Sequence, residues 1–145
     1  MSTRYYTLID YGLVLTFSEM CELLKTYKGD NEELKKRIEN NNVNDVDFID
    51  DLLYNDFYEF DVQYNFEGDF NNFIGRNKKT FEETPMYYLP LAKSNIFDEK
   101  ILFTKHDNEE DVINEIRLKL KKMKLDVDIG FIKWNVGNVT GVYLS

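Results

Sequence analysis

The sequence predicts an α+β protein of one domain, in which helices pack on an antiparallel or mixed sheet and a β-hairpin ends the chain. Stretches with apolar residues at every third or fourth position, as on one face of a helix, are interspersed with stretches in which every second residue is apolar, as in a half-buried strand. The chain has 145 residues, a usual length for a single domain. We therefore expect one domain over residues 1–145.

The first part of the chain predicts one strand followed by three short helices. Aromatic and β-branched residues are frequent over Tyr5–Leu15, which favours a strand, either continuous or interrupted at Gly12. Thr16 and Glu19 have the spacing of a capping box, so a helix should begin there. The inward-facing residues of the next two helices would be Leu34 and Ile38, and then Val46, Ile49, Leu52 and Leu53.

The middle of the chain has the clearest β pattern. Apolar and polar residues alternate over Tyr58–Phe66, which predicts a strand with a buried aromatic face and an acidic face. Gly68-Asp69 would end this strand, and Gly75–Thr84 would form a loop. Met86–Leu91 and Lys100–Thr104 are expected to be two further strands.

The last part predicts a helix and a hairpin. The helix would run from Glu109 to about Lys124, with acidic residues in its first turn and lysines in its last, as the helix dipole favours. Ile129–Val136 and Val139–Leu144 flank Gly137-Asn138, a pair typical of a two-residue hairpin turn. The free edge of this hairpin could pair two copies of the chain into a homodimer.

The negative charge is concentrated in one quarter of the sequence. The formal net charge is −9, yet no Lys or Arg occurs between Ile38 and Gly75. Ten carboxylates lie in that window, while the rest of the chain carries 17 acidic and 18 basic residues. The ten are Glu39, Asp45, Asp47, Asp50, Asp51, Asp56, Glu59, Asp61, Glu67 and Asp69. This distribution predicts an acidic surface that attracts basic partners.

Carboxylates along a strand could imitate the phosphates of a nucleic acid. Alternate residues on one strand face are about 6.6 Å apart, and Glu59 and Asp61 have this spacing in the sequence. We predict that a protein with a basic nucleic-acid-binding surface would contact Asp47, Asp50, Asp51, Asp56, Glu59, Asp61, Glu67 and Asp69. Tyr54, Phe57 or Phe70 would anchor that contact if exposed, and would belong to the core if buried. An acidic face that is merely solvated is the alternative.

No spacing in the sequence predicts a catalytic, metal or cofactor site. Asp45–Asp56 resembles a calcium loop but lacks the glycine at its sixth position and the glutamate at its twelfth. Asp126 and Asp128 have no further ligands nearby in the sequence. The only histidine, His106, is not spaced from a nucleophile in a recognisable way, and Cys21 is expected in the core.

Composition indicates where the protein acts. The single cysteine and the lack of a signal-peptide-like or membrane-spanning apolar run favour the cytoplasm of a bacterial host cell, without membrane contact. The chain has 15 Asn and 14 Lys but four Arg, a usage that follows AT-rich codons and suggests a low-GC bacterium or its phage. Direct binding of nucleic acid is not expected, because the net charge would repel phosphate.

In size and acidity the chain is similar to the small proteins by which phages block bacterial nucleases, anti-CRISPR proteins and DNA mimics among them. No motif assigns it to a named family. The resemblance implies a non-enzymatic inhibitor that acts through protein–protein contact, with no cofactor. Two alternatives stay open: an immunity protein that neutralises a cognate toxin, and an enzyme of unrecognised type acting on a small nucleotide through carboxylates and His106.

Overall fold

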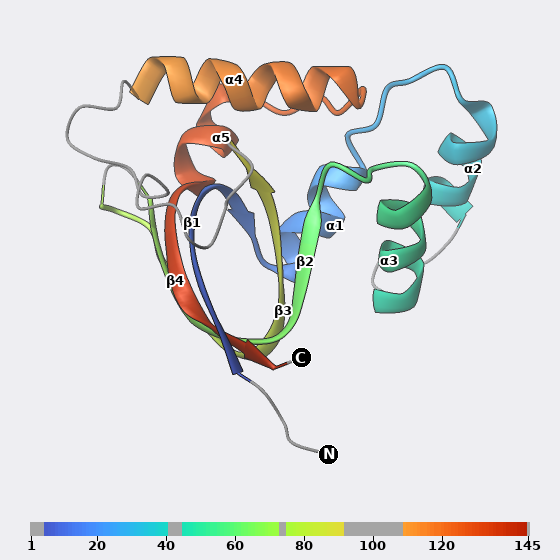
Figure 1. Cartoon of the computed structure of the whole chain (residues 1–145). Helices are drawn as coiled ribbons and strands as arrows, with labels where there is room; N and C mark the ends of the chain where they lie inside the picture. Colours follow the sequence, from blue (N-terminus) through green and yellow to red (C-terminus); the bar gives the residue numbers. More distant parts are fainter. Residues whose placement is uncertain (1–4, 41–44, 73–74, 92–108, 145) are drawn as a thin grey trace.

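A computed structural model describes residues 5–40, 45–72, 75–91 and 109–144, and the α+β class is confirmed (Figure 1). The strands are β1 (Tyr5–Leu15), β2 (Asp61–Asn72), β3 (Lys78–Pro90) and β4 (Val136–Leu144). The helices are α1 (Phe17–Leu24), α2 (Glu32–Asn40), α3 (Val46–Asn55), α4 (Glu109–Lys122) and α5 (Ile129–Asn135). Within these ranges, none of the helices combines the length and the apolar character needed to cross a lipid bilayer.

The strands form a closed antiparallel barrel in the order β1-β3-β2-β4. β4 lies between β1 and β2 and is hydrogen-bonded to both. β3 completes the ring, because its last residues pair with the end of β1 while most of its length pairs with β2. The long strands bend strongly as they pass around the barrel (Figure 1).

Two glycines allow β2 and β4 to meet closely. Gly68 of β2 lies opposite Gly141 of β4. A Cβ on Gly141 would lie 2.3 Å from the carbonyl oxygen of Glu67, and a Cβ on Gly68 would lie 2.4 Å from that of Thr140. Both contacts are with backbone atoms, so no side-chain rotation could relieve them. The barrel therefore requires glycine at this crossing.

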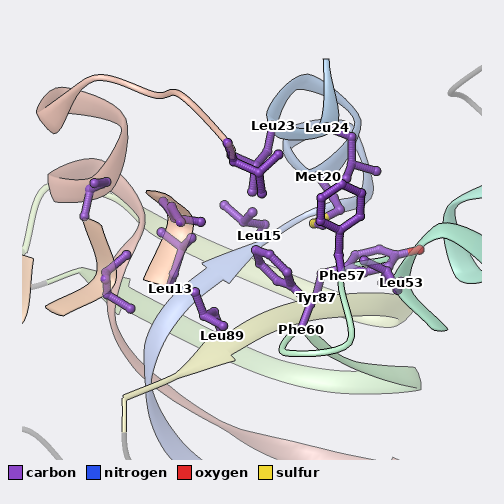
Figure 2. Packing of buried hydrophobic residues seen from close by; sticks show 14 of the residues in the cluster. Leu13, Leu15, Met20, Leu23, Leu24, Leu53, Phe57, Phe60, Tyr87 and Leu89 are labelled. Carbon is purple, nitrogen blue, oxygen red and sulfur yellow. The ribbon is translucent and has the colours of Figure 1, made fainter. Parts of the chain in front are cut away.

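Buried side chains form two clusters. The first comes from the strands alone and fills the inside of the barrel: Leu8, Val14, Phe66, Phe70, Phe81, Met86, Tyr88 and Val139. Since successive strand residues point to opposite sides of a sheet, their neighbours Leu13, Leu15, Tyr87 and Leu89 point outward. These outward residues join the apolar faces of the helices in the second cluster (Figure 2). The helices are thus held against the outer surface of the barrel.

Local hydrogen bonds fix where the first helices begin. The predicted capping box is present, because Thr16 Oγ1 accepts from the backbone N–H of Glu19 and the Glu19 carboxylate accepts from that of Thr16. Asp45 caps α3 by accepting from the N–H of Asp47. Three of the four predicted inward residues of α3 are buried, namely Ile49, Leu52 and Leu53. The fourth, Val46, is exposed.

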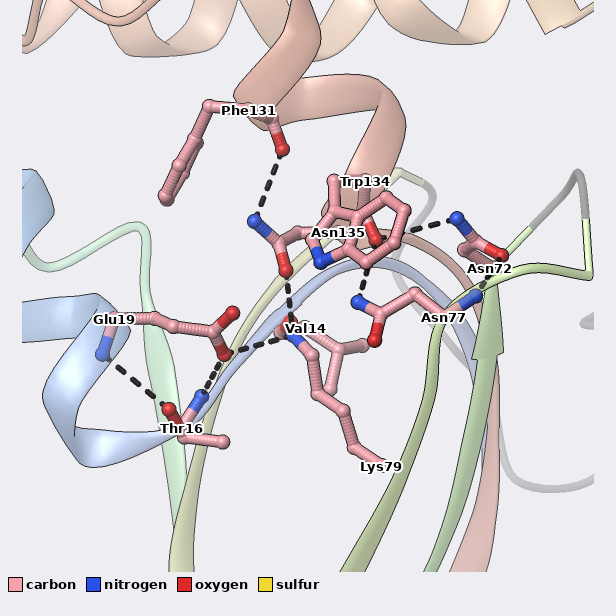
Figure 3. A network of polar contacts seen from close by, with 9 residues as sticks. All are labelled: Val14, Thr16, Glu19, Asn72, Asn77, Lys79, Phe131, Trp134 and Asn135. Atoms are coloured by element: carbon pink, nitrogen blue, oxygen red, sulfur yellow. Dashed lines mark hydrogen bonds and ion pairs between the residues drawn. The ribbon is translucent and has the colours of Figure 1, made fainter.

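A buried lysine joins the barrel to α1 and α5 (Figure 3). Lys79 Nζ lies 2.8 Å from Glu19 Oε1, 2.6 Å from Asn135 Oδ1 and 2.7 Å from the carbonyl oxygen of Val14. The three N–H groups of the ammonium therefore have three acceptors, and the Phe70 ring centroid lies 4.8 Å away. Burial lowers the pKa of Lys79, while Glu19 opposes that shift. Because every partner comes from the chain itself, the network is structural.

The predicted C-terminal hairpin is wrong, although a C-terminal strand is present. Residues Ile129–Asn135 form α5, and β4 continues through Gly137-Asn138 without turning. The helix begins there because the Asp128 side chain accepts from the N–H of Phe131. Since β4 is paired on both sides, it leaves no free edge for the homodimer contact that the hairpin suggested.

Two boundaries near the middle of the chain also differ from the prediction. β2 does not end at Gly68-Asp69 but runs to Asn72, because these residues pair with both β3 and β4. The expected loop Gly75–Thr84 lies largely in β3, which begins at Lys78. The predicted strand Lys100–Thr104 and His106 lie outside the described residues.

Candidate functional site

An open cleft lies between α3 and the first residues of β2. β2 is one of the barrel strands, and α3 lies beside the barrel (Figure 1). Its volume is about 520 Å³. The lining consists of Asp50, Leu53, Tyr54, Tyr58, Phe60, Asp61, Val62 and Tyr64. Three of these residues are tyrosines and two are aspartates, and neither Lys nor Arg occurs among the lining residues that the structure describes. The cleft is therefore both aromatic and acidic.

The helical repeat places the polar residues of α3 at the cleft. Leu53 is buried in the cluster outside the barrel and also lines the cleft. Asp50 and Tyr54 are four residues apart, a spacing that brings side chains onto one face of a helix. Both line the cleft, and Tyr54 is 84% exposed.

A bulge in β2 changes which side of the barrel its side chains face. Val62 packs outside the barrel with the helices, whereas Phe66 is buried inside it. The pairing with β3 shifts register between Gln63 and Phe66, where Asn65 has a φ of 52°. An extra residue in one strand reverses the alternation of side chains. Tyr64 lies at this reversal and is 42% exposed.

The prediction of one aromatic face is therefore wrong for both of its tyrosines. The alternation placed Tyr58 and Tyr64 on one buried face with Phe60 and Phe66. In the structure Tyr58 lies in the turn before β2 and is 77% exposed. Only the two phenylalanines of this set are buried. The presence of Asn65 inside the run was the available sequence signal, because Asn is one of the few residues that tolerate a positive φ.

Asp50 lies at the cleft, and its two carboxylate oxygens differ in their hydrogen bonding. The Tyr64 side chain is hydrogen-bonded to the Asp50 carboxylate, and burial together with this bond raises the pKa of Tyr64. Asp50 Oδ1 is buried and accepts no hydrogen bond within the described part of the chain. Burial also raises the pKa of Tyr87, to which Asp50 contributes further negative potential. The interior side of the cleft thus carries negative charge that lacks a counterion.

Asp61 contributes the second carboxylate. It begins β2 and lines the cleft. Surrounding protein atoms desolvate its carboxylate and raise the pKa of Asp61. A positive charge beside it would act in the opposite direction and stabilise the ionised form. The Asp61 carboxylate is therefore suited to receive a cation from outside.

Four of the eight predicted contact residues lie at or beside the cleft. Asp50 and Asp61 line it. Asp47 is exposed in the first turn of α3, and its charge reaches Tyr64. Glu59 is exposed in the turn before β2. Because Glu59 precedes the strand, the phosphate-like spacing predicted for Glu59 and Asp61 along one strand face is wrong.

Two further predicted residues share one arginine that stands just before the acidic window, and its single positive charge offsets one of their two negative charges. Arg37 of α2 lies 2.7 Å from Asp51 and 3.6 Å from Asp56. The side chains of this group are partly exposed, so the ion pairs add little stability. They do remove much of the negative field of Asp51 and Asp56, which are therefore weaker candidates for contact with a basic partner.

The last two predicted residues, Glu67 and Asp69, do not belong to the cleft. Both are exposed on β2 beyond the bulge. At about 3.3 Å per residue, Glu67 lies up to roughly 20 Å along the strand from Asp61. Asp69 accepts a hydrogen bond from Thr80 Oγ1 at 3.2 Å. The acidic window therefore divides into a group at the cleft and a separate pair on the barrel.

The three aromatic residues considered as interface anchors differ in exposure. Tyr54 is exposed at the cleft, whereas Phe57 and Phe70 are 1% and 0% exposed and belong to the core. Tyr27 packs edge-on against Phe57, and Phe70 fills the inside of the barrel. The exposed position of Tyr54 could have been read from the helical repeat, because it lies opposite the buried stripe of α3.

The other sequence candidates have structural roles. Cys21 is buried, and burial raises the pKa of its thiol, which disfavours the reactive thiolate. Asp126 forms an ion pair of 2.7 Å with Lys28, and Asp128 caps α5. Among the described residues, no group of three or more His, Cys, Asp and Glu side chains is arranged to hold a metal ion. In the described part of the chain, the cleft is the strongest candidate for a functional site.

Comparison of the chain with models of protein families, with curated proteins and with solved structures finds no match in any of the three. The function is therefore inferred from the side chains of the cleft.

Proposed function

We propose that this chain is a non-enzymatic inhibitor that uses the cleft between α3 and β2 to occupy the basic, nucleic-acid-binding surface of a bacterial nuclease or defence protein. The observation that supports this proposal most directly is the meeting of uncompensated carboxylates and exposed tyrosines at one place. Carboxylates attract a basic groove from a distance. Tyrosines supply the rigid contact area that dominates many protein interfaces.

The effective charge of this surface comes from four residues. Asp47, Asp50, Glu59 and Asp61 lie at or beside the cleft and form none of the ion pairs described above. Carboxylates placed together repel one another, and this repulsion lowers the stability of the folded chain. A basic partner that binds here removes the repulsion, so the same residues that weaken the free protein strengthen the complex.

Three exposed tyrosines provide the second part of the surface. A tyrosine buries about 150–250 Å² when it is covered, and such rings are enriched at the centres of interfaces. Tyr54 and Tyr58 are almost entirely available for such contact, because each is more than three-quarters exposed. The phenol hydroxyl can also hydrogen-bond to a partner, unlike the phenylalanines of the core.

The proposed partner explains why both features occur together. A nuclease binds phosphate with Lys and Arg, and these side chains would pair with the carboxylates of the cleft. Such an inhibitor fits a phage protein directed against a host nuclease, including the anti-CRISPR and DNA-mimic types. An immunity protein directed against a nuclease toxin would use the same electrostatics, and the identity of the inhibited nuclease would distinguish the two.

The proposal is tested by measuring inhibition of purified bacterial nucleases with basic grooves, CRISPR effector nucleases among them, with a fluorescent oligonucleotide as substrate. We expect inhibition that weakens as salt is raised from 50 to 500 mM. The variant Glu59→Lys/Asp61→Lys should weaken inhibition by at least 100-fold. The matched control Glu82→Lys/Glu115→Lys changes the net charge equally at exposed positions outside the cleft. Equal effects of the two variants, or inhibition of none of the nucleases, would contradict the proposal.

A further inference from the structure

The cleft has features that an extended acidic surface does not need. Three of its lining residues are apolar, namely Leu53, Phe60 and Val62, and three others are tyrosines. Its volume of about 520 Å³ falls within the roughly 300–1,000 Å³ of ordinary ligand pockets. A flat charged surface would attract a basic partner without any such hollow. The hollow therefore favours recognition of a particular group on that partner.

We infer that the cleft receives an arginine side chain of the partner, with the guanidinium group packed against the tyrosines and paired with Asp50 and Asp61. This inference rests on the proposed function and specifies the group that the site recognises.

Charge and hydrogen bonding require a cationic donor. Asp50 Oδ1 is buried and lacks a hydrogen bond among the described residues, so a positive charge nearby would stabilise the Asp50 carboxylate. Asp61 is partly desolvated, and none of the lysines and arginines that the structure describes lines the cleft. A cation in the cleft would offset the negative charge of both carboxylates, and its N–H groups would hydrogen-bond to Asp61. A phosphate group would instead be repelled by them, which disfavours a nucleic acid as the occupant.

The aromatic walls distinguish arginine from lysine. A guanidinium group is planar, stacks on aromatic rings and carries five N–H donors in a fixed arrangement. An ammonium group is compact, more strongly hydrated and has three donors. Tyr54, Tyr58 and Tyr64 offer three rings around one cleft, and each exposed cation–π contact contributes roughly a two- to five-fold gain in affinity. The apolar lining residues suit the three methylene groups of the arginine side chain.

The test uses three short acetylated and amidated peptides that differ at one position: Gly-Arg-Gly, Gly-Lys-Gly and Gly-citrulline-Gly. Citrulline has the shape of arginine without its charge. Binding is followed by NMR through the ring signals of Tyr54, Tyr58 and Tyr64 and the backbone signals of the whole chain. We expect the arginine peptide to shift the cleft signals, the lysine peptide to bind at least three-fold more weakly, and the citrulline peptide to leave the signals unchanged at the same concentration.

Substitutions in the chain distinguish binding in a defined pocket from general electrostatic attraction to the acidic window. Asp61→Asn and Tyr58→Leu should each weaken binding of the arginine peptide by about three- to ten-fold. Asp69→Asn is the matched control, because it removes one carboxylate of the same acidic window outside the cleft, and it should change binding by less than two-fold. Thermal unfolding of each variant verifies that the fold is retained; both Tyr58 and Asp61 are exposed.

Several outcomes would overturn the inference. These are equal binding of the arginine and citrulline peptides, NMR shifts spread evenly over all exposed carboxylates, equal losses of affinity in Asp61→Asn and Asp69→Asn, or larger shifts of the tyrosine ring signals with oligothymidine than with the arginine peptide.

The experiments distinguish failure of this inference from failure of the proposed function. Nuclease inhibition that is lost in Glu59→Lys/Asp61→Lys without arginine binding would leave the inhibitor function intact. Arginine binding without inhibition of any nuclease would leave the pocket intact and remove the nuclease as partner.

Discussion

Replacement of Lys79 by methionine should destabilise the protein more than replacement of any exposed lysine. The Lys79 side chain is 9% exposed, and its ammonium group contacts Glu19, Asn135 and the carbonyl oxygen of Val14 at 2.6–2.8 Å. Methionine retains most of the apolar stem but removes all three hydrogen bonds. Glu19 would then be a largely buried carboxylate without its counterion.

The expected loss follows from the chemistry of that network. Removal of one member of a buried ion pair costs about 3–5 kcal/mol, because the other charge is left uncompensated. For a chain of this length that loss corresponds to a decrease of roughly 10 °C or more in melting temperature. The double variant Lys79→Met/Glu19→Gln should recover part of the loss, since it removes the stranded charge.

The measurement is urea denaturation at pH 7, followed by circular dichroism, of the wild type, both single variants and the double variant. Lys78→Met is the control, because Lys78 is the adjacent residue in β3 and is exposed. A loss below about 1 kcal/mol in Lys79→Met, with no recovery in the double variant, would refute the claim that the network ties the barrel to α1 and α5.

Two further predictions concern the barrel and the cleft. Gly141→Ala should destabilise the chain by about 2–3 kcal/mol or prevent folding, because its Cβ would lie 2.3 Å from the carbonyl oxygen of Glu67. Gly130→Ala should have a much smaller effect, because Gly130 is exposed and among the described residues the added Cβ would meet only the Asp128 side chain, at 3.3 Å. Equal melting temperatures for the two variants would contradict the close crossing of β2 and β4. Asp61→Asn should raise the melting temperature slightly at pH 7, because desolvation raises the pKa of Asp61 in the folded chain and so disfavours its ionised form. The wild type becomes relatively more stable as the pH falls through that raised pKa. The advantage of Asp61→Asn should therefore disappear below about pH 4, where Asp61 is protonated in both the folded and the unfolded chain. A gain in melting temperature that persists unchanged at pH 3 would have another cause.

Local sequence signals predicted four of the five described helices, α1 to α4, whereas α5 was expected to be a strand. The capping residues Thr16 and Asp45 act within a few positions of themselves, so their effect can be read without knowledge of the fold. The apolar stripe of α4 likewise needs only the helical repeat. The bounds of strand Tyr5–Leu15 were predicted for a similar reason, because aromatic and β-branched residues are frequent in it, and the strand runs through Gly12 without interruption.

The errors arise where long-range pairing decides the structure. Gly68 and Gly137 looked like chain breaks, yet each lies inside a strand where another backbone passes close by. A sequence does not show that approach, because the partner strand is distant along the chain. The change of side at the β2 bulge is similar, since Val62 packs with the helices and Phe66 packs inside the barrel. The alternation of apolar and polar residues alone cannot show that one strand contributes side chains to both clusters.

The candidate site was predicted in part. The absence of Lys and Arg between Ile38 and Gly75 directed attention to α3 and β2. Sequence distance could not show that Arg37 would reach Asp51 and Asp56, or that the bulge would expose Tyr64. The structure thus reduces an acidic window of ten carboxylates to a small cleft with tyrosine walls.

The most direct test of the central claim is hydrogen exchange of the chain in complex with an inhibited nuclease. The cleft surface predicts that the amides of Val46–Asn55 and of the turn and strand up to Tyr64 become protected, while those of α4 exchange as in the free chain. Protection confined to α4 or to the far half of β2 around Glu67 and Asp69, with exchange at the cleft unchanged, would contradict it.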